Sequence, residues 1–221
     1  MPESFRGLTA DYGLQTLDFR LQTIEKSPDC HRAVRIFLCM LGRMKKSLYL
    51  CRRMIQIIVK NELLSSAALE GMDAFLNVVI TATREAIGGE PTEETMAQLN
   101  ADQMTLLCWD TLHTEVMDGG FIQLIHNGYG PFIFKNPFAK ALNKMWHMRE
   151  LSKRLYEVHT LWLQNREEIE RDCTDDEFMT LFERFPQFDD YDDWFVENEE
   201  QLVEHIAHYV DENIDKFITV K

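Results

Sequence analysis

The sequence lacks most features that would place it in a specialised class of protein. It contains 6 prolines and 10 glycines in 221 residues, which excludes a collagen-like or low-complexity chain. Its apolar runs stay well below the roughly 20 residues that a membrane-spanning helix needs. The first residues hold no apolar core followed by a cleavage site, so we expect no secretory signal. The expected class is a globular protein of the cytoplasm.

Cysteine is sparse, and the spacing of the cysteines suggests no disulfide framework. The five cysteines are odd in number and form no C-x-x-C pair. We therefore expect reduced thiols, as in a cytoplasmic protein, rather than disulfides. Cys108 lies beside Trp109 in a predicted helix, which favours packing over a role as a nucleophile.

The motifs of common enzymes are missing as well. There is no Walker loop, no dinucleotide-binding glycine pattern after a strand and no G-x-S-x-G. The pair His205-x-x-His208 has no further metal-binding pattern beside it, so we expect neither a metal nor a cofactor. His113, with Asp110, Glu115 and Asp118 nearby, is the best-placed group for acid–base chemistry. It shares only part of a helix face with them, which favours a histidine at the edge of the core, and we predict no catalytic residues.

Charge is distributed unevenly along the chain, whose net charge is −14. Residues 1–60 carry 11 lysines and arginines against 5 acids, residues 61–160 carry 7 against 13, and residues 161–221 carry 5 against 19. Only the first part could supply the basic face that nucleic-acid binding needs. The last part would repel phosphate and attract basic partners.

Apolar residues recur with a helical period almost throughout, and no stretch alternates as a strand does. The predicted fold class is therefore all-α, a helical bundle. After a first helix, apolar spacings of three and four residues predict a long helix over residues 34–58. A third helix, Leu63–Ile87, returns along it and ends at Gly88-Gly89. We predict a net basic helical hairpin over residues 1–90, packed on an acidic helical domain over residues 91–221.

Local signals divide the second half into helices. Asn100 with Gln103, and Thr174 with Glu177, form the capping-box pattern that opens a helix. The remaining predictions are an interruption at Gly119-Gly120 with a helical turn over 121–126 after it, a loop over Asn127–Pro131, a helix from 136 to about 148 that continues towards 170, a short helix that ends near Pro186 and a last helix from about Asp193 to Phe217.

The last predicted helix has two chemically distinct faces. Its apolar residues share one broad face, and acids lie opposite at spacings of three and four residues. These acids follow one another about every 4.5–6 Å, within a factor of two of the ~3.4 Å between phosphates along one DNA strand. The candidate partner-binding residues are this acidic stripe (Asp193, Glu197, Glu200, Glu204, Asp211 and Asp215) and the run that precedes it (Asp189, Asp190 and Asp192).

Two interpretations of the acidic stripe remain open. Solvated acidic faces are common on amphipathic helices, so a face without a partner is the simpler interpretation. Residues 167–215, however, hold 19 acids and only two bases, Arg171 and Arg184, a self-repulsion that stability alone does not explain. This imbalance supports a surface that attracts a basic partner, but the charge pattern alone still favours the solvated face.

Three segments of the second half resemble one bacterial protein family. They resemble the C-terminal domain family named after a DNA-mimic protein, over about residues 100–217. The Gly-Gly-Phe-x-Gln element is the most specific part of the pattern. The segments are Glu115-Val-Met-Asp-Gly-Gly-Phe-Ile-Gln123 followed by His126-Asn127-Gly128; Pro137-Phe-Ala-Lys-Ala-Leu142; and Tyr191-Asp-Asp-Trp-Phe195 leading to His208-Tyr-Val-Asp-Glu-Asn213 and Phe217.

The resemblance implies an all-α fold with no known catalytic reaction, often dimeric, which acts by presenting acidic side chains to a DNA-binding protein. We therefore expect a non-catalytic interaction module whose acidic stripe engages a basic protein partner, for example a DNA-binding regulator. A homodimer is one assembly that the resemblance allows. The alternative is a small-ligand binder or an enzyme with a site around Gly119-Gly120 and the following loop, in a pocket lined by His113, Glu115, Gln123, His126 and Tyr129.

The Gly-Gly-Phe-x-Gln element also has a structural explanation. Gly119-Gly120 can adopt positive φ and turn the chain from one helix into the next. Phe121 then enters the core, while Gln123 and Asn127 bind backbone groups that the break frees. We predict this structural role for the element, Glu115 included, over a ligand site.

The predicted long helix and its flanks carry cations opposite the apolar seam. Pairing with another helix is their favoured role, because helix-turn-helix domains are more compact and a chain of net charge −14 is repelled by anionic lipid. We expect no direct binding to nucleic acid or membrane. If these cations instead cover the acidic stripe, within the chain or across a dimer, the stripe is an assembly feature. The cations are Arg32, Arg35, Arg43, Lys46, Arg53 and Lys60.

Overall fold

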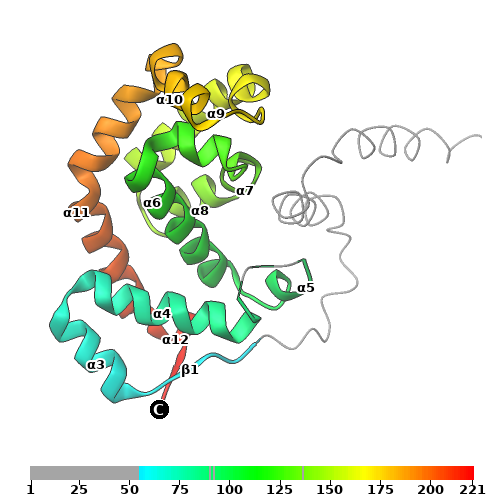
Figure 1. Cartoon of the computed structure of the whole chain (residues 1–221). Helices are drawn as coiled ribbons and strands as arrows, with labels where there is room; N and C mark the ends of the chain where they lie inside the picture. The colour runs from blue at the N-terminus through cyan, green and yellow to red at the C-terminus, as the bar shows by residue number, and fades with distance from the viewer. Residues whose placement is uncertain (1–54, 90, 92, 136) are drawn as a thin grey trace, which may run out of the picture.

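The described part of the protein is built almost entirely of helices, which confirms the predicted all-α class. The computed structural model describes residues 55–221 except positions 90, 92 and 136 (Figure 1). Its elements are β1 (Ile58–Val59), α3 (Asn61–Glu70), α4 (Met72–Ile87), α5 (Glu93–Met96), α6 (Ala101–His126), α7 (Gly130–Phe134), α8 (Phe138–Lys144), α9 (Arg149–Ile169), α10 (Asp175–Arg184), the 3-10 turn η1 (Pro186–Phe188), α11 (Asp189–Glu212), α12 (Ile214–Phe217) and β2 (Thr219–Val220).

Helix α6 lies at the centre of the packing. It contacts α4, α7, α8, α9, α11 and α12, and α4 also packs against α11. One hydrophobic cluster runs through these elements from Ile57 to Ile218. Residues 55–87 therefore share a core with α6 and α11, and the two-domain division at residue 91 stays a prediction. No helix of the described chain is long and apolar enough to cross a bilayer.

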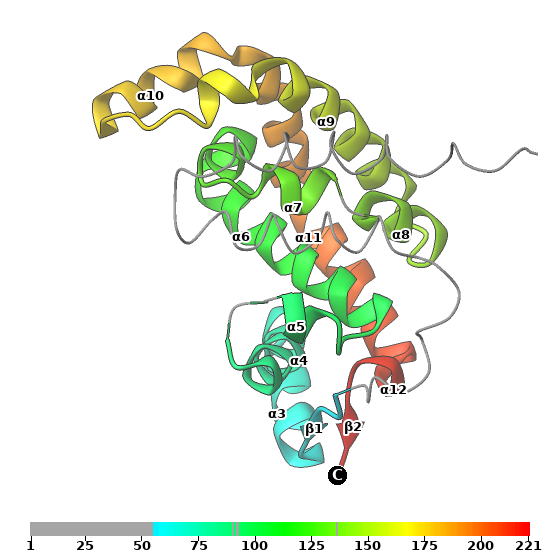
Figure 2. The same ribbon diagram turned by 90° about the vertical axis from the view of Figure 1, so that its right-hand side faces the viewer.

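Most of the predicted N-terminal hairpin lies outside the described residues, and its end differs from the prediction. Positions 1–54 hold the first helix, most of the long helix and all of the predicted cations except Lys60. The helix predicted through residue 58 is wrong from residue 55 onward, because Ile58–Val59 pairs in parallel with Thr219–Val220. Figure 2 shows this pair beside the C-terminus. Ile57 is buried and Ile58 is 48% exposed, an alternation that suits a strand and not a helix.

The helix predicted over residues 63–87 is in fact two helices, α3 and α4, so that prediction is wrong at its centre. Gly71 separates them with a φ of 144° and a ψ of 175°, a conformation that belongs to glycine. The end at Gly88-Gly89 is confirmed. Gly88 adopts left-handed geometry, and the Gly89 N–H donates to Arg84 O at 2.8 Å, which closes the last turn.

Both predicted capping boxes are confirmed. The Gln103 N–H donates to Asn100 Oδ1 at 2.9 Å, and the Asn100 N–H donates to Gln103 Oε1 at 3.0 Å. Thr174 and Glu177 repeat the arrangement at the start of α10. The first box does more than cap, since Gln103 Nε2 also donates to Phe217 O at 2.8 Å. It therefore fixes the start of α6 to α12, near the C-terminus.

Two predictions in the middle of the chain are wrong in part. The helix expected from 136 towards 170 divides into α8 and α9, because His147 between them adopts a φ of 60° that a helix does not continue through. Helix α7 begins at Gly130, inside the predicted loop Asn127–Pro131. Pro131 occupies the first turn of α7, a position where its missing N–H costs nothing.

The last long helix, α11, has different ends from those predicted. It begins at Asp189, four residues early, directly after η1. It ends at Glu212, because Asn213 leaves helical geometry with a φ of −124°. Asp215 therefore lies on the short helix α12 rather than on the same helix as the rest of the acidic stripe.

Candidate protein-docking face

Helix α11 presents an apolar face to the core and an acidic face to solvent. Phe195, Ile206 and Val210 are fully buried, and the helix packs against α4 and α6. All six residues of the acidic stripe are exposed, as are Asp189 and Asp190. Figure 1 shows α11 running along one edge of the molecule from α10 to α12. The exposed acids thus follow the outside of the fold.

No lysine or arginine among residues 55–221 as described forms an ion pair with the acidic stripe. The one ionic contact found there joins Glu204 to His208 Nε2 at 3.9 Å. The alternative that the predicted N-terminal cations cover the stripe falls outside the described residues. Counter-charge for this face therefore has to come from solvent ions, from residues 1–54 or from another molecule.

Asp192 differs from its acidic neighbours because its carboxylate turns inward. Its Oδ1 accepts a hydrogen bond from the Phe121 N–H at 2.8 Å. Burial raises the pKa of this carboxyl to about 6, against the opposing effect of that hydrogen bond, and the nearby Asp189 and Asp193 raise it further. We therefore remove Asp192 from the docking residues, since it serves the fold.

The glycine pair kinks α6 as predicted. Gly119 has a φ of −160° and a ψ of 28°, and Gly120 has a φ of 70° and a ψ of −175°, so helical geometry is lost at both. Phe121 follows in the core, 2% exposed. The kink frees the Phe121 N–H, and Asp192 of α11 satisfies it from a distant part of the sequence. Asp192 acts there as a helix cap supplied by another helix.

The polar residues of the element bond mainly to one another. Gln123 Nε2 donates to Asp118 Oδ2 at 2.7 Å, so the prediction that Gln123 binds a freed backbone group is wrong. Asn127 Nδ2 donates to Glu115 Oε2 at 2.8 Å. Both bonds join one side of the kink to the other, and both support a structural role for the element.

The residues of the alternative ligand site bond to separate parts of the fold. His113 Nε2 lies 2.6 Å from Glu199 Oε1 on α11, and His126 Nδ1 lies 2.8 Å from Ile169 O. Asp110, the predicted companion of His113, pairs instead with Arg84 of α4 at 2.6 Å. These contacts connect helices, and they give His113 and His126 structural partners.

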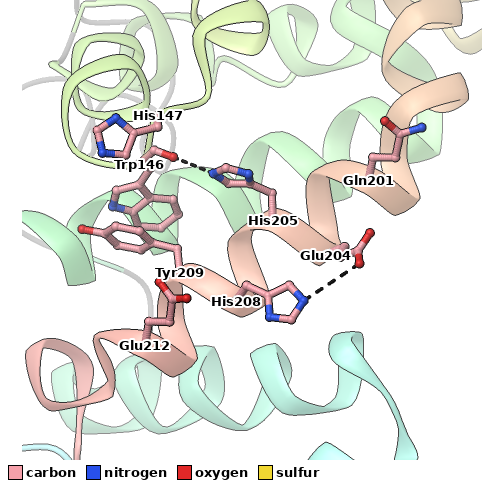
Figure 3. Close-up of a pocket in the computed structure, with 8 residues that line it drawn as sticks. All are labelled: Trp146, His147, Gln201, Glu204, His205, His208, Tyr209 and Glu212. Carbon is pink, nitrogen blue, oxygen red and sulfur yellow. Dashed lines mark hydrogen bonds and ion pairs between the residues drawn. The ribbon is translucent and has the colours of Figure 1, made fainter.

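A cleft opens beside the acidic stripe, around the His205-x-x-His208 pair (Figure 3). Its volume is about 600 Å³, and it is open to solvent. One wall is the segment around Trp146 and His147, between α8 and α9. The other wall is one face of α11, where residues recur at spacings of three and four: Gln201, Glu204, His205, His208, Tyr209 and Glu212.

Hydrogen bonds from the start of α6 hold the floor of the cleft. Asp102 Oδ1 accepts from Trp146 Nε1 at 3.0 Å and from Tyr209 Oη at 2.9 Å. The two rings stack with their centres 4.8 Å apart, as Figure 3 shows. Burial and the Asp102 carboxylate raise the pKa of Tyr209 well above its ordinary value, so its hydroxyl stays a donor. Lys216 Nζ lies 5.6 Å from the centre of the Tyr209 ring.

The His205-x-x-His208 pair divides between two partners. His205 Nε2 lies 2.6 Å from Trp146 O, across the cleft, whereas His208 lies near Glu204 on its own helix. In the described part of the chain, no group of three or more His, Cys, Asp or Glu residues is placed to hold a metal ion.

Comparison with known proteins assigns the family. The model of the family described as DMP19-like protein matches residues 97–213, more than half of the chain, including the kink and all of α11. The DNA mimic protein DMP19 of Neisseria meningitidis serogroup B (strain ATCC BAA-335 / MC58) is 32% identical over 126 residues, which cover 57% of this chain and 76% of that protein. The predicted resemblance is thereby confirmed: the chain belongs to the DMP19-like protein family.

Proposed function

We propose that this protein is a non-catalytic interaction module that binds a DNA-binding protein through its acidic face. The docking surface consists of the acidic stripe with Asp189 and Asp190. The observation that carries the proposal is the row of exposed carboxylates along α11, which no lysine or arginine among the described residues pairs with. The similarity to a DNA mimic protein, DMP19 of Neisseria meningitidis, supports the same mode of action.

Electrostatics makes this surface suited to a partner that normally holds phosphates. Between Asp193 and Asp211 the helix axis rises by about 27 Å, which approaches one turn of duplex DNA. Unpaired surface charges contribute little to the stability of their own fold, but they accelerate encounter with a basic partner. We place the partner among the DNA-binding regulators of the cytoplasm. A homodimer stays a prediction.

Neutralising four acids of the stripe should weaken partner binding and leave folding nearly intact. The variant is Glu197→Gln, Glu200→Gln, Glu204→Gln and Asp211→Asn. At about 0.5 kcal/mol for each exposed pair, the loss of affinity at low salt is roughly 30-fold. The free energy of unfolding should change by less than about 1 kcal/mol, as measured in urea. Binding is measured by immobilising the protein, capturing partners from a lysate of the source cells at two salt concentrations and eluting with duplex DNA.

A matched control removes the same four charges elsewhere. The control variant changes four exposed acids on α3 and α4: Glu62→Gln, Glu70→Gln, Asp73→Asn and Glu85→Gln. This control should capture the same proteins as the unmodified chain, and duplex DNA should release them. Capture that both variants retain equally, or that duplex DNA fails to reverse, would contradict the proposal.

A further inference from the structure

The cleft beside the acidic stripe carries a more specific inference, which rests on the proposed function. We propose that it receives an arginine side chain of the basic partner, with the guanidinium group held between Glu204 and Glu212. The docking surface then has one defined anchor in addition to its diffuse charge.

The charged groups that line the cleft, two glutamates, accept hydrogen bonds, whereas Gln201, His147 and His208 can each donate or accept. Glu204 and Glu212 are exposed carboxylates, which only accept when ionised. The carbonyl of Trp146 can only accept, so the 2.6 Å contact places the proton of His205 on Nε2 and leaves Nδ1 as an acceptor in the neutral ring. The Tyr209 hydroxyl, a potential donor, is used by Asp102. A ligand rich in donors and without acceptors complements this lining, and guanidinium has five donors and no acceptor.

The spacing of the two carboxylates favours arginine over lysine. Glu204 and Glu212 are eight residues apart on one helix, so their Cα atoms lie about 12 Å apart along the axis, with His208 midway along the same face and 3.9 Å from Glu204. A planar guanidinium presents donors in divergent directions and can bond to two carboxylates that approach it from opposite sides. An ammonium group is instead a compact, strongly hydrated point charge with three donors and no planar fork.

The walls of the cleft are fixed before any ligand arrives. Asp102 holds Trp146 and Tyr209 together, and Trp146 is fully buried. His205 closes the far side by its bond to Trp146 O. A preformed site loses less entropy on binding than one that has to be ordered. The negative charge of the lining disfavours phosphate and other anions, so a cation is the expected occupant.

The tryptophan side chains provide a direct test on the full-length protein. The sequence has four tryptophans, and the indole N–H of Trp146 lies at the floor of the cleft. A blocked six-arginine peptide, titrated at low salt and followed by nitrogen–proton correlation spectra, should shift the Trp146 indole signal. The indole signals of Trp109, Trp162 and Trp194 serve as internal controls and should move less. If the Trp146 signal does not shift, the proposal that the cleft binds arginine is overturned. This holds whether the cleft stays empty or the net basic residues 1–60 of the same chain occupy it.

Paired variants separate the cleft from general charge. Glu204→Gln with Glu212→Gln neutralises the cleft, and Glu197→Gln with Glu200→Gln removes the same charge from the stripe outside it. The first pair should weaken binding of the six-arginine peptide about tenfold more than the second, which is the scale of a charge-assisted bidentate contact. A six-lysine peptide should lose affinity equally with both pairs.

The outcomes distinguish this inference from the proposed function. Equal losses with both pairs and both peptides would overturn the arginine cleft while leaving the acidic face as the docking surface. If neither peptide binds the unmodified protein at low salt, the acidic face itself fails as a docking surface. A selective loss of affinity for the six-arginine peptide in the Glu204→Gln, Glu212→Gln variant, together with the shift of the Trp146 signal, supports both the arginine cleft and the acidic docking surface.

Discussion

Replacing Gly120 with alanine should lower the free energy of unfolding by about 4 kcal/mol. The φ of 70° with ψ of −175° is essentially restricted to glycine, and forcing another residue into it costs about 1–3 kcal/mol. The new Cβ would also lie 2.5 Å from Asp192 Oδ2 and 2.8 Å from its Cγ, so the carboxylate has to move. Its departure leaves the Phe121 N–H without an acceptor, a loss of about 1–3 kcal/mol. The free energy of unfolding in urea measures the sum of the backbone cost and the cost of the lost hydrogen bond.

Gly88→Ala is the matched control for this prediction. Gly88 also has a positive φ, 83°, but nothing lies within 4 Å of its virtual Cβ. The substitution should therefore cost only the left-handed backbone term, about 1–2 kcal/mol. The double variant Gly120→Ala, Asp192→Ala should lose less free energy of unfolding than the sum of the two single variants. Asp192→Ala removes the carboxylate with which the new Cβ at position 120 would clash. Equal costs at Gly120 and Gly88 would show that the approach of Asp192 does not matter.

Replacing Asp192 with asparagine should stabilise the protein at pH 7.5 by about 2 kcal/mol. The pKa of about 6 lies above the ordinary value of 3.8, so between those pH values the native state binds more protons than the unfolded chain. The free energy of unfolding therefore falls as pH rises through this window, by about 3 kcal/mol in total for this group. The negative charge of Asp192 also lies near the start of α11, where it is favourable by about 0.3–1 kcal/mol. This favourable effect reduces the expected gain in the free energy of unfolding from about 3 to about 2 kcal/mol. Asparagine keeps an acceptor for the Phe121 N–H and removes the buried charge.

The pH dependence of the difference makes this prediction specific. The two proteins should differ least in stability well below pH 3.8, where Asp192 is protonated in both states, and the difference should grow as pH rises to about 6.5. Urea unfolding at several pH values measures this, with Asp193→Asn as the control because Asp193 is exposed on the same turn. A gain that is constant with pH, or a loss of stability at pH 7.5, would show that Asp192 is not a buried charge.

Features with a local cause could be predicted from the sequence. The two capping boxes need residues only three positions apart, and the end of α4 needs only the left-handed Gly88. The kink at Gly119-Gly120 follows from glycine itself. The exposure of the acidic stripe follows from the helical period of the apolar residues opposite it.

Features that depend on distant residues could not be predicted in this way. Asp192 stands among three other aspartates within five positions, and nothing in that run marks it as the one that caps the kink in α6. The break at His147 has no glycine or proline to announce it. The cleft needs α11, the His147 segment and Asp102 together, so it exists only once three separate segments have packed.

The pairing of β1 with β2 has a consequence for the order in which the chain folds. The paired residues are about 160 positions apart, so closing that loop in a flexible chain costs about 4.5 kcal/mol, more than this short ladder returns. After α4, α6 and α11 have packed, the two ends are already neighbours, and most of that entropy is lost before the strands meet. The ladder is therefore expected to form late in folding and to open first in the native state. Hydrogen exchange at the Thr219 and Lys221 amides, which donate to Ile57 O and Val59 O, should be faster than in the centre of α6.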